Sequence, residues 1–174
     1  MYKRQVTENI KVKFVNPRHG IYRYIPYKGN VVTIDKNGGQ KKLLYYADFD
    51  LLKNDSNTDL QEDSDGNSEV LQFGSEDSTV NEENYKFTYQ LTPQYQGDTF
   101  DYLYYNIFPT LWRNNIPKGS TFTIHFPKKT DLKSVNFFYG RYGESKNAKD
   151  VLTLKYNEKN AQITGTVSYT HLRA

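Results

Sequence analysis

The sequence predicts an all-β protein, built as one antiparallel β-sandwich domain. Apolar and polar residues alternate in 85–91 (YKFTYQL) and in 121–126 (TFTIHF), and this period of two is typical of a strand with one buried face. The chain contains 16 Tyr and 10 Phe, residue types that favour strands. Turn residues separate many short alternating segments, which is the pattern of a sandwich.

The expected strands follow one another at short intervals along the chain. They cover 8–16, 20–27, 31–35, 41–49, 69–74, 85–91, 100–108, 121–126, 134–140, 151–156 and 161–167. Asn37-Gly38-Gly39 predicts a hairpin turn, because glycine and asparagine accept a positive φ. The segment 101–112 is alternatively a short helical turn that ends at Pro109.

The segment 53–68 has no core pattern and predicts an acidic, solvated loop. Its DSDGN stretch raises the alternative of a calcium loop. Aligning Gly66 with the sixth position of an EF-hand places Gln61 at the first position and Gln72 at the twelfth, where a bidentate glutamate is needed. We therefore expect no metal site there. The chain also has no cysteine, which excludes a disulfide and a thiolate metal site.

The two ends of the chain can be encoded by DNA sequences that are reverse complements of each other. With one choice of codons MYKRQ reads GTGTATAAGAGACAG, and the reverse complement of this string contains the opening codons of the terminal VSYTHLRA. We interpret residues 1–5 and 167–174 as translated sequencing adapter, and such additions are set aside before the fold is considered. Residues 6–166 are then the domain, read as an internal fragment of a longer protein.

The charge of the chain depends on these ends. The whole sequence has 23 Lys+Arg against 20 Asp+Glu, and without Lys3, Arg4 and Arg173 the count is 20 against 20. A neutral domain gives no electrostatic reason to bind nucleic acid, so we expect no nucleic-acid partner. No stretch approaches the roughly 20 apolar residues of a membrane span.

The sequence contains no recognisable catalytic constellation. His19 and His125 are the histidines outside the ends, and neither lies in a nucleophile, zinc or phosphate-binding motif. Asp98 and Asp101 are the acids that a glycan-active hydrolase would use, since paired carboxylates need no set spacing in the sequence. We expect a domain that is not an enzyme and that holds no cofactor.

Aromatic side chains offer the main alternative, a carbohydrate-binding module. Tyr102, Tyr104, Tyr105 and Trp112 lie close together in the sequence. An aromatic ring combines a broad apolar face with a polar tip, which suits stacking on a sugar. We take Tyr104, Tyr105 and Trp112 as candidate binding residues.

One further stretch, HGIYRYIPY at 19–27, carries a family resemblance. Preceded by VTENIKVKFVN, it resembles the first two strands of the domain-of-unknown-function family 2207, whose typical stretch is Gly-hydrophobic-Tyr-Arg-x-Ile-Pro. An acidic residue is commoner in that family where this chain has Tyr24. The resemblance covers nearly all of 6–166 and continues through LQFGS, NYKFTYQL, FDYLYYNIFPTLWRNNIP, TFTIHFPK, FFYGRYG and NEKNAQITGTV.

The resemblance implies a location more than an activity. The family consists of extracytoplasmic N-terminal domains of predicted bacterial membrane proteins, with no established ligand or reaction. It implies a β-rich domain outside the cell membrane, anchored by helices that lie outside this fragment. The expected role is recognition of, or assembly with, an unknown envelope protein or glycan.

Arg23 is the charged residue of the family stretch and the fourth candidate binding residue. It lies on the opposite side of its expected strand from Tyr22 and Tyr24. It can pair with a carboxylate inside the sandwich or present its charge to a partner. We expect the first, because an arginine between apolar strand positions is usually paired and packed. Gly20 would allow a tight turn or a close backbone approach.

Overall fold

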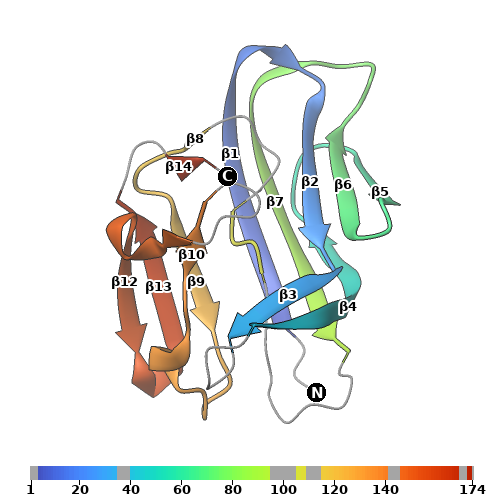
Figure 1. Ribbon diagram of the computed structural model, residues 1–174. Coiled ribbons are helices and arrows are strands. Elements are labelled where there is room, and N and C mark those ends of the chain that lie inside the picture. Colours follow the sequence, from blue (N-terminus) through green and yellow to red (C-terminus); the bar gives the residue numbers. More distant parts are fainter. Residues whose placement is uncertain are drawn as a thin grey trace. The chain divides into compact units, whose positions relative to one another are not determined.

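The computed structural model describes residues 4–34, 40–94, 105–108, 115–140, 146–168 and 172–173. These residues form β-strands and short connections (Figure 1), and the strand pairs are antiparallel. The all-β, antiparallel prediction is confirmed. In the described part of the chain, no helix is long and apolar enough to cross a membrane. The chain divides into two compact units, Met1–Asn106 and Ile107–Ala174.

Unit 1 contains two sheets. The first has the order β1-β7-β4-β3 and consists of β1 (Arg4–Arg18), β7 (Val80–Pro93), β4 (Gln40–Asn54) and β3 (Lys28–Ile34). The second has the order β2-β6-β5 and consists of β2 (Gly20–Pro26), β6 (Ser68–Gly74) and β5 (Leu60–Ser64). The chain changes sheets four times, between β1 and β2, between β2 and β3, between β4 and β5, and between β6 and β7 (Figure 1).

The inner faces of these two sheets contact each other through aromatic rings. Phe73 of β6 lies 5.4 Å from Tyr85 and 4.8 Å from Phe87 of β7, measured between ring centroids. All three side chains are buried. Apolar contact between the inner faces of two sheets is what a β-sandwich requires. The other buried apolar side chains of the described part of unit 1 are Ile21, Ile25, Tyr45, Ala47, Val70, Leu71, Tyr89 and Leu91.

His19 lies at the corner between β1 and β2. Its Nδ1 is 2.9 Å from the carbonyl oxygen of Ser78 and 3.2 Å from that of Ser75. Both carbonyls belong to the connection between β6 and β7, where the chain crosses back to the first sheet. With its hydrogen on Nδ1, His19 donates to these oxygens and so links the connection between β1 and β2 to the connection between β6 and β7.

Three expectations from the sequence differ from the structure. The expected acidic loop over 53–68 contains the edge strand β5, and of the expected strand 134–140 only Phe138–Tyr139 (β10) forms one. β5 has a half-buried Leu60 followed by four exposed residues, so its backbone pairing with β6 leaves no alternating pattern. The expected strand 100–108 does not form in its described part, 105–108. The same four residues also form no helical turn, the alternative expected over 101–112. The rest of both segments and Asn37-Gly38-Gly39 lie outside the described residues.

Unit 2 is built around a three-stranded sheet. Its order is β12-β13-β9, formed by β12 (Leu152–Asn157), β13 (Gln162–Val167) and β9 (Thr121–His125). The ring of Phe122 covers the backbone of Gly165, its cross-strand neighbour, and occupies the space that a Cβ would need. Two-residue strands form the pairs β8 (Asn115–Ile116) with β14 (Leu172–Arg173), and β10 with β11 (Lys146–Asn147).

Single helical turns and a small apolar cluster complete the described part of unit 2. The turns are the 3-10 helices η1 (Leu132–Ser134), η2 (Ala148–Asp150) and η3 (Glu158–Asn160). The cluster consists of the buried residues Ile116, Ala148, Val151 and Val167, with Phe108, Phe137, Tyr139 and Leu152 packed against it. The η2 turn therefore supplies two of the four buried members, counting Val151 at its C-cap.

Candidate functional site

The described residues hold one buried cluster of charged and phenolic side chains, and it lies in unit 1. It starts on β2, whose alternation places Arg23 on the same face as Ile21 and Ile25. Arg23 is 1% exposed, although it is flanked in the sequence by the exposed Tyr22. A buried charge is stable only when it is paired and hydrogen-bonded. The local sequence of β2 therefore requires a partner for Arg23.

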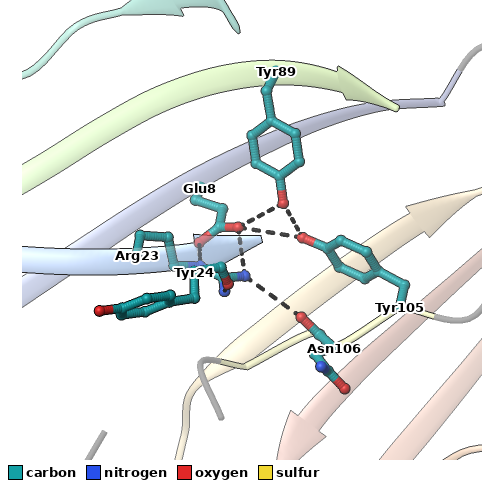
Figure 2. A network of polar contacts seen from close by, with 6 residues as sticks. All are labelled: Glu8, Arg23, Tyr24, Tyr89, Tyr105 and Asn106. Carbon is teal, nitrogen blue, oxygen red and sulfur yellow. Dashed lines mark hydrogen bonds and ion pairs between the residues drawn. The ribbon is translucent and has the colours of Figure 1, made fainter. Parts of the chain in front are cut away.

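That partner is Glu8 of β1, in the other sheet of unit 1. Arg23 Nε donates to Glu8 Oε2 at 2.8 Å and Nη2 donates to Oε1 at 2.8 Å (Figure 2). Two parallel bonds between a guanidinium and a carboxylate give a strong, directional ion pair. Arg23 Nη1 also donates to the carbonyl oxygen of Tyr24, and Nη2 lies 3.5 Å from that of Asn106.

Two tyrosines complete the hydrogen bonding of the carboxylate. Tyr89 of β7 donates its hydroxyl to Glu8 Oε1 at 2.8 Å, and Tyr105 donates to the same oxygen at 3.2 Å. The two hydroxyls are also within hydrogen-bond distance of each other, as the dashed lines in Figure 2 show, and with one proton each they share two protons among these three contacts. We call Glu8, Arg23, Tyr89 and Tyr105 the Arg23 cluster. It joins both sheets of unit 1 to the segment that follows them in the chain.

Burial and charge in the Arg23 cluster shift the pKa values of Arg23, Tyr89 and Tyr105. Burial disfavours the charged guanidinium, but the charge and hydrogen bonds of Glu8 outweigh this and raise the pKa of Arg23. Burial, followed by the negative charge of Glu8, raises the pKa of both Tyr89 and Tyr105. At neutral pH the guanidinium is charged and both phenols are protonated donors. The arrangement suits a structural anchor, because each side chain is hydrogen-bonded to another member and the remaining donors of Arg23 point to backbone carbonyl oxygens.

The predicted site residues are only partly brought together. Arg23 and Tyr105 both belong to the Arg23 cluster, and Arg23 is paired inside unit 1, the first of its two expected roles. The hydroxyl of Tyr105 is directed at Glu8. Tyr104 and Trp112 lie outside the described residues, as do the other aromatic and acidic candidates, Tyr102, Asp98 and Asp101.

Sequence reasoning did not identify Glu8 and Tyr89. Glu8 occupies an inward position of β1, between Val6 and Ile10 in the alternation, which is an unusual place for an acid. That placement was a usable signal for a buried partner of Arg23. Tyr89 carried no such signal, because Tyr85 and Phe87 are also buried aromatic residues of β7. Only the hydrogen bond from its hydroxyl to Glu8 distinguishes Tyr89.

The acidic stretch around β5 uses its carboxylates locally. Asp65 accepts the backbone N–H groups of Asn67 at 2.9 Å and Ser68 at 2.6 Å, which closes the turn between β5 and β6. Asp63 accepts the N–H of Ser64 at 2.8 Å. Among the residues that the structure describes, no group of three or more His, Cys, Asp or Glu side chains is placed to hold a metal ion.

Comparison with known proteins gives one match. A family model described as "Predicted membrane protein (DUF2207) N-terminal domain" matches residues 4–170, which spans both units. A search of curated proteins and a search of solved structures gave no match. The family match covers nearly the whole chain and agrees with the motifs in β2, β6 and β7. The chain therefore belongs to the DUF2207 family of predicted membrane protein N-terminal domains.

Proposed function

We propose that this chain is the extracytoplasmic N-terminal domain of a membrane-anchored bacterial protein, and that it recognises or assembles with another envelope component without catalysis. The description of its family supports the proposal that the chain is part of a membrane protein. The placement outside the membrane and the envelope partner rest on the resemblance noted in the sequence, together with the β-rich fold.

The observation that carries the non-enzymatic role is the state of the Arg23 cluster. Catalytic groups must reach a substrate and exchange protons with it near the working pH. Here the guanidinium is 1% exposed, and the phenols have pKa values raised by burial and by Glu8. We therefore assign the Arg23 cluster a structural role, and we assign recognition to exposed surfaces.

Exposed aromatic side chains and sheet edges provide such surfaces. In unit 1, Tyr22 is 49% and Tyr46 is 40% exposed, and in unit 2, Phe138 is 61% and Tyr156 is 49% exposed. Aromatic residues are enriched in protein interfaces, because they bury a large area and keep a polar tip. β5 ends the second sheet of unit 1, and a sheet edge can pair with a strand from a partner.

The location is tested by labelling single cysteines in the full-length protein in intact cells. The chain has no cysteine of its own, so Glu76→Cys, in the exposed connection after β6, is the sole thiol in this domain. We expect a membrane-impermeant maleimide to label Glu76→Cys without permeabilisation. The matched control is Ala47→Cys, at a position 1% exposed, which reacts only when the domain unfolds. Labelling of Glu76→Cys only after permeabilisation would overturn the proposed location.

The non-enzymatic role is tested separately with the purified chain and cell-envelope glycans. We expect no product to form during prolonged incubation. The outcome that would contradict the non-enzymatic proposal is reproducible turnover that disappears in Asp98→Asn or Asp101→Asn at an unchanged melting temperature. This outcome would establish the hydrolase alternative. Binding of a glycan that is weakened by Trp112→Ala would instead support the carbohydrate-binding alternative.

A further inference from the structure

We infer that the sheet of unit 2 carries a basic surface that docks on the anionic headgroups of a phospholipid membrane. The surface consists of the outer face of the sheet β12-β13-β9 and of the lysines at the end of this sheet where β9 and β12 terminate. The inference rests on one part of the proposed function, that the chain belongs to a membrane protein. It does not depend on which envelope component the domain recognises or on which side of the membrane it lies.

The two units carry opposite net charges. Unit 1 has 12 Lys+Arg against 16 Asp+Glu, whereas unit 2 has 11 Lys+Arg against 4 Asp+Glu. Without Arg173, which lies in the terminal segment interpreted as adapter, unit 2 still has 10 Lys+Arg against 4 Asp+Glu. The balanced charge of the domain as a whole therefore conceals a basic unit, and a basic surface is attracted to anionic lipids.

The outer face of the unit 2 sheet presents polar side chains. Strand alternation places Phe122 and the buried Ile163 on one face and leaves nine positions on the outer face. Each strand contributes three of them: Thr121, Thr123 and His125 from β9, Gln162, Thr164 and Thr166 from β13, and Thr153, Lys155 and Asn157 from β12. None of the nine is an acid, an aliphatic residue or a Phe, Tyr or Trp.

The hydroxyl and amide groups of this face are donors that a phosphate can use. Gln162 Nε2 donates to Thr164 Oγ1 at 3.3 Å, and the hydroxyl oxygens of Thr164 and Thr123 are 3.3 Å apart. A threonine hydroxyl has one proton to donate and rotates to reach an acceptor. Because Thr123 is exposed, its hydroxyl can turn from Thr164 to a phosphate oxygen, which only accepts hydrogen bonds.

Four exposed lysines lie at one end of this sheet or beside it. β9 and β12 both run antiparallel to β13, so they terminate at the same end (Figure 1). The N–H of Phe126 donates to the carbonyl oxygen of Ala161 at 2.7 Å, which holds the turn after β9 beside η3. The lysines are Lys128 and Lys129 of this turn, Lys155 of β12 and Lys159 of η3. We call these lysines and the nine outer-face residues the basic face.

The positive charge at this end is not neutralised by ion pairs. Within the described ranges none of the four lysines forms one. Asp131 and Glu158 are the acids of the same connections, and Asp131 Oδ1 accepts the backbone N–H of Lys133 at 3.0 Å. The lysines of the basic face therefore remain available to an anionic partner.

The composition of the basic face favours lipid phosphates over other partners. Glycans and single-stranded nucleic acids are held largely by stacking on aromatic rings, and the face has no Phe, Tyr or Trp. It also has no apolar side chain that would enter the hydrocarbon, so its contact is with the headgroups. Lysines near anionic lipids are attracted to them, and a membrane protein keeps its domain close to such a surface.

Vesicle binding of the full chain tests the basic face. We expect the chain to co-sediment with vesicles that mix phosphatidylcholine and phosphatidylglycerol, and not with vesicles of phosphatidylcholine alone. Lys128→Gln combined with Lys129→Gln should weaken the binding about thirtyfold, since each lysine near an anionic surface contributes about a factor of five to six. The matched control is Lys11→Gln combined with Lys13→Gln, which removes the same charge from exposed lysines of β1 and should change the binding less than about twofold at physiological salt.

Thr123→Val tests the sheet face separately from its charge, because it removes the hydroxyl and keeps the shape. We expect binding to the mixed vesicles to weaken about fivefold, as for the loss of one hydrogen bond of average strength. The melting temperature of each variant, measured without vesicles, shows whether it is folded. Unchanged binding in Thr123→Val would overturn the role of the outer face.

Three other outcomes would overturn the inference as a whole. They are equal binding to both kinds of vesicle, an equal loss of binding in the Lys11 and Lys13 control, and tighter binding to duplex DNA than to the mixed vesicles at the same phosphate concentration. The last would make a nucleic acid the partner. Because lipid vesicles contain no envelope protein or glycan, these results are independent of the tests of location and of the non-enzymatic role.

Discussion

Gly20 and Gly74 face each other across β2 and β6, and neither position has room for a methyl group. The two residues are paired in the antiparallel register. A Cβ on Gly20 would lie 1.7 Å from the carbonyl oxygen of Phe73, and a Cβ on Gly74 would lie 1.9 Å from that of His19. Both residues have positive φ values, +153° and +112°. The glycine that opens HGIYRYIPY is therefore needed for a close approach of two backbones.

We expect Gly20→Ala and Gly74→Ala each to lower the free energy of unfolding by about 3 kcal/mol, since the clash is with backbone atoms that cannot rotate away. Gly29→Ala in β3 is the control. A Cβ there meets nothing within 4 Å. Alanine is favoured over glycine within a strand by about 0.5–1 kcal/mol, so the control should be neutral or slightly stabilising. Urea unfolding measures all three, and equal effects at Gly20 and Gly29 would contradict the close approach.

We expect Glu8→Gln to destabilise unit 1 by about 3–5 kcal/mol, because it leaves the Arg23 guanidinium buried without its counter-charge. The matched control is Asp55→Asn, which removes the carboxylate of a surface ion pair with Lys53 at 2.7 Å. Lys53 is 65% exposed, and such pairs contribute less than about 1 kcal/mol. Denaturant unfolding compares the two, and a Glu8→Gln effect as small as that of Asp55→Asn would show that the buried pair is dispensable.

Two tyrosines of β7 should respond oppositely to loss of the hydroxyl. Tyr89 donates to Glu8 at 2.8 Å, whereas the buried hydroxyl of Tyr85 has no hydrogen-bond partner in the described part of the chain. We expect Tyr89→Phe to cost about 1.5–3 kcal/mol, as for a bond to a charged group. Tyr85→Phe should be neutral or stabilising, because it removes an unsatisfied polar group. Thermal and urea unfolding of both variants provide the measurement, and a larger loss for Tyr85→Phe would contradict it.

Glu69 should make stability depend on pH in acid solution. Partial burial, followed by the charges of Glu62 and Asp63, raises the pKa of Glu69 above 4.5. The folded state then binds a proton more tightly than the unfolded state, so ionisation of Glu69 destabilises the fold above its folded pKa. We expect Glu69→Gln to be more stable than the parent chain at pH 7. This advantage should shrink as the pH falls through the folded pKa and be absent below about pH 4.5.

Urea unfolding of both chains at several pH values measures this difference. The control repeats the comparison in chains that carry Glu62→Gln. With one repelling charge removed, the gain from Glu69→Gln at pH 7 should be smaller. A gain that is independent of pH, or unaffected by Glu62→Gln, would rule out the electrostatic origin.

Alternation in the sequence predicted the strands that have one buried face. The expected segments 20–27 and 121–126 correspond within one residue to Gly20–Pro26 and Thr121–His125. It failed for Leu60–Ser64, because an edge strand with four exposed side chains is held by backbone hydrogen bonds that any residue can make. It also overestimated the strand at 134–140, where a 3-10 turn over Leu132–Ser134 precedes a two-residue strand.

The sequence by itself determined that the chain is all-β and that Arg23 lies on the opposite face of its strand from Tyr22. Both are local properties, since successive side chains of any strand point to opposite faces. Only the tertiary structure decided that Glu8, Tyr89 and Tyr105 surround that arginine. Their meeting depends on the register of β1 with β7, the packing of two sheets and the path of the chain to Tyr105. Such long-range geometry leaves no periodic trace in the sequence.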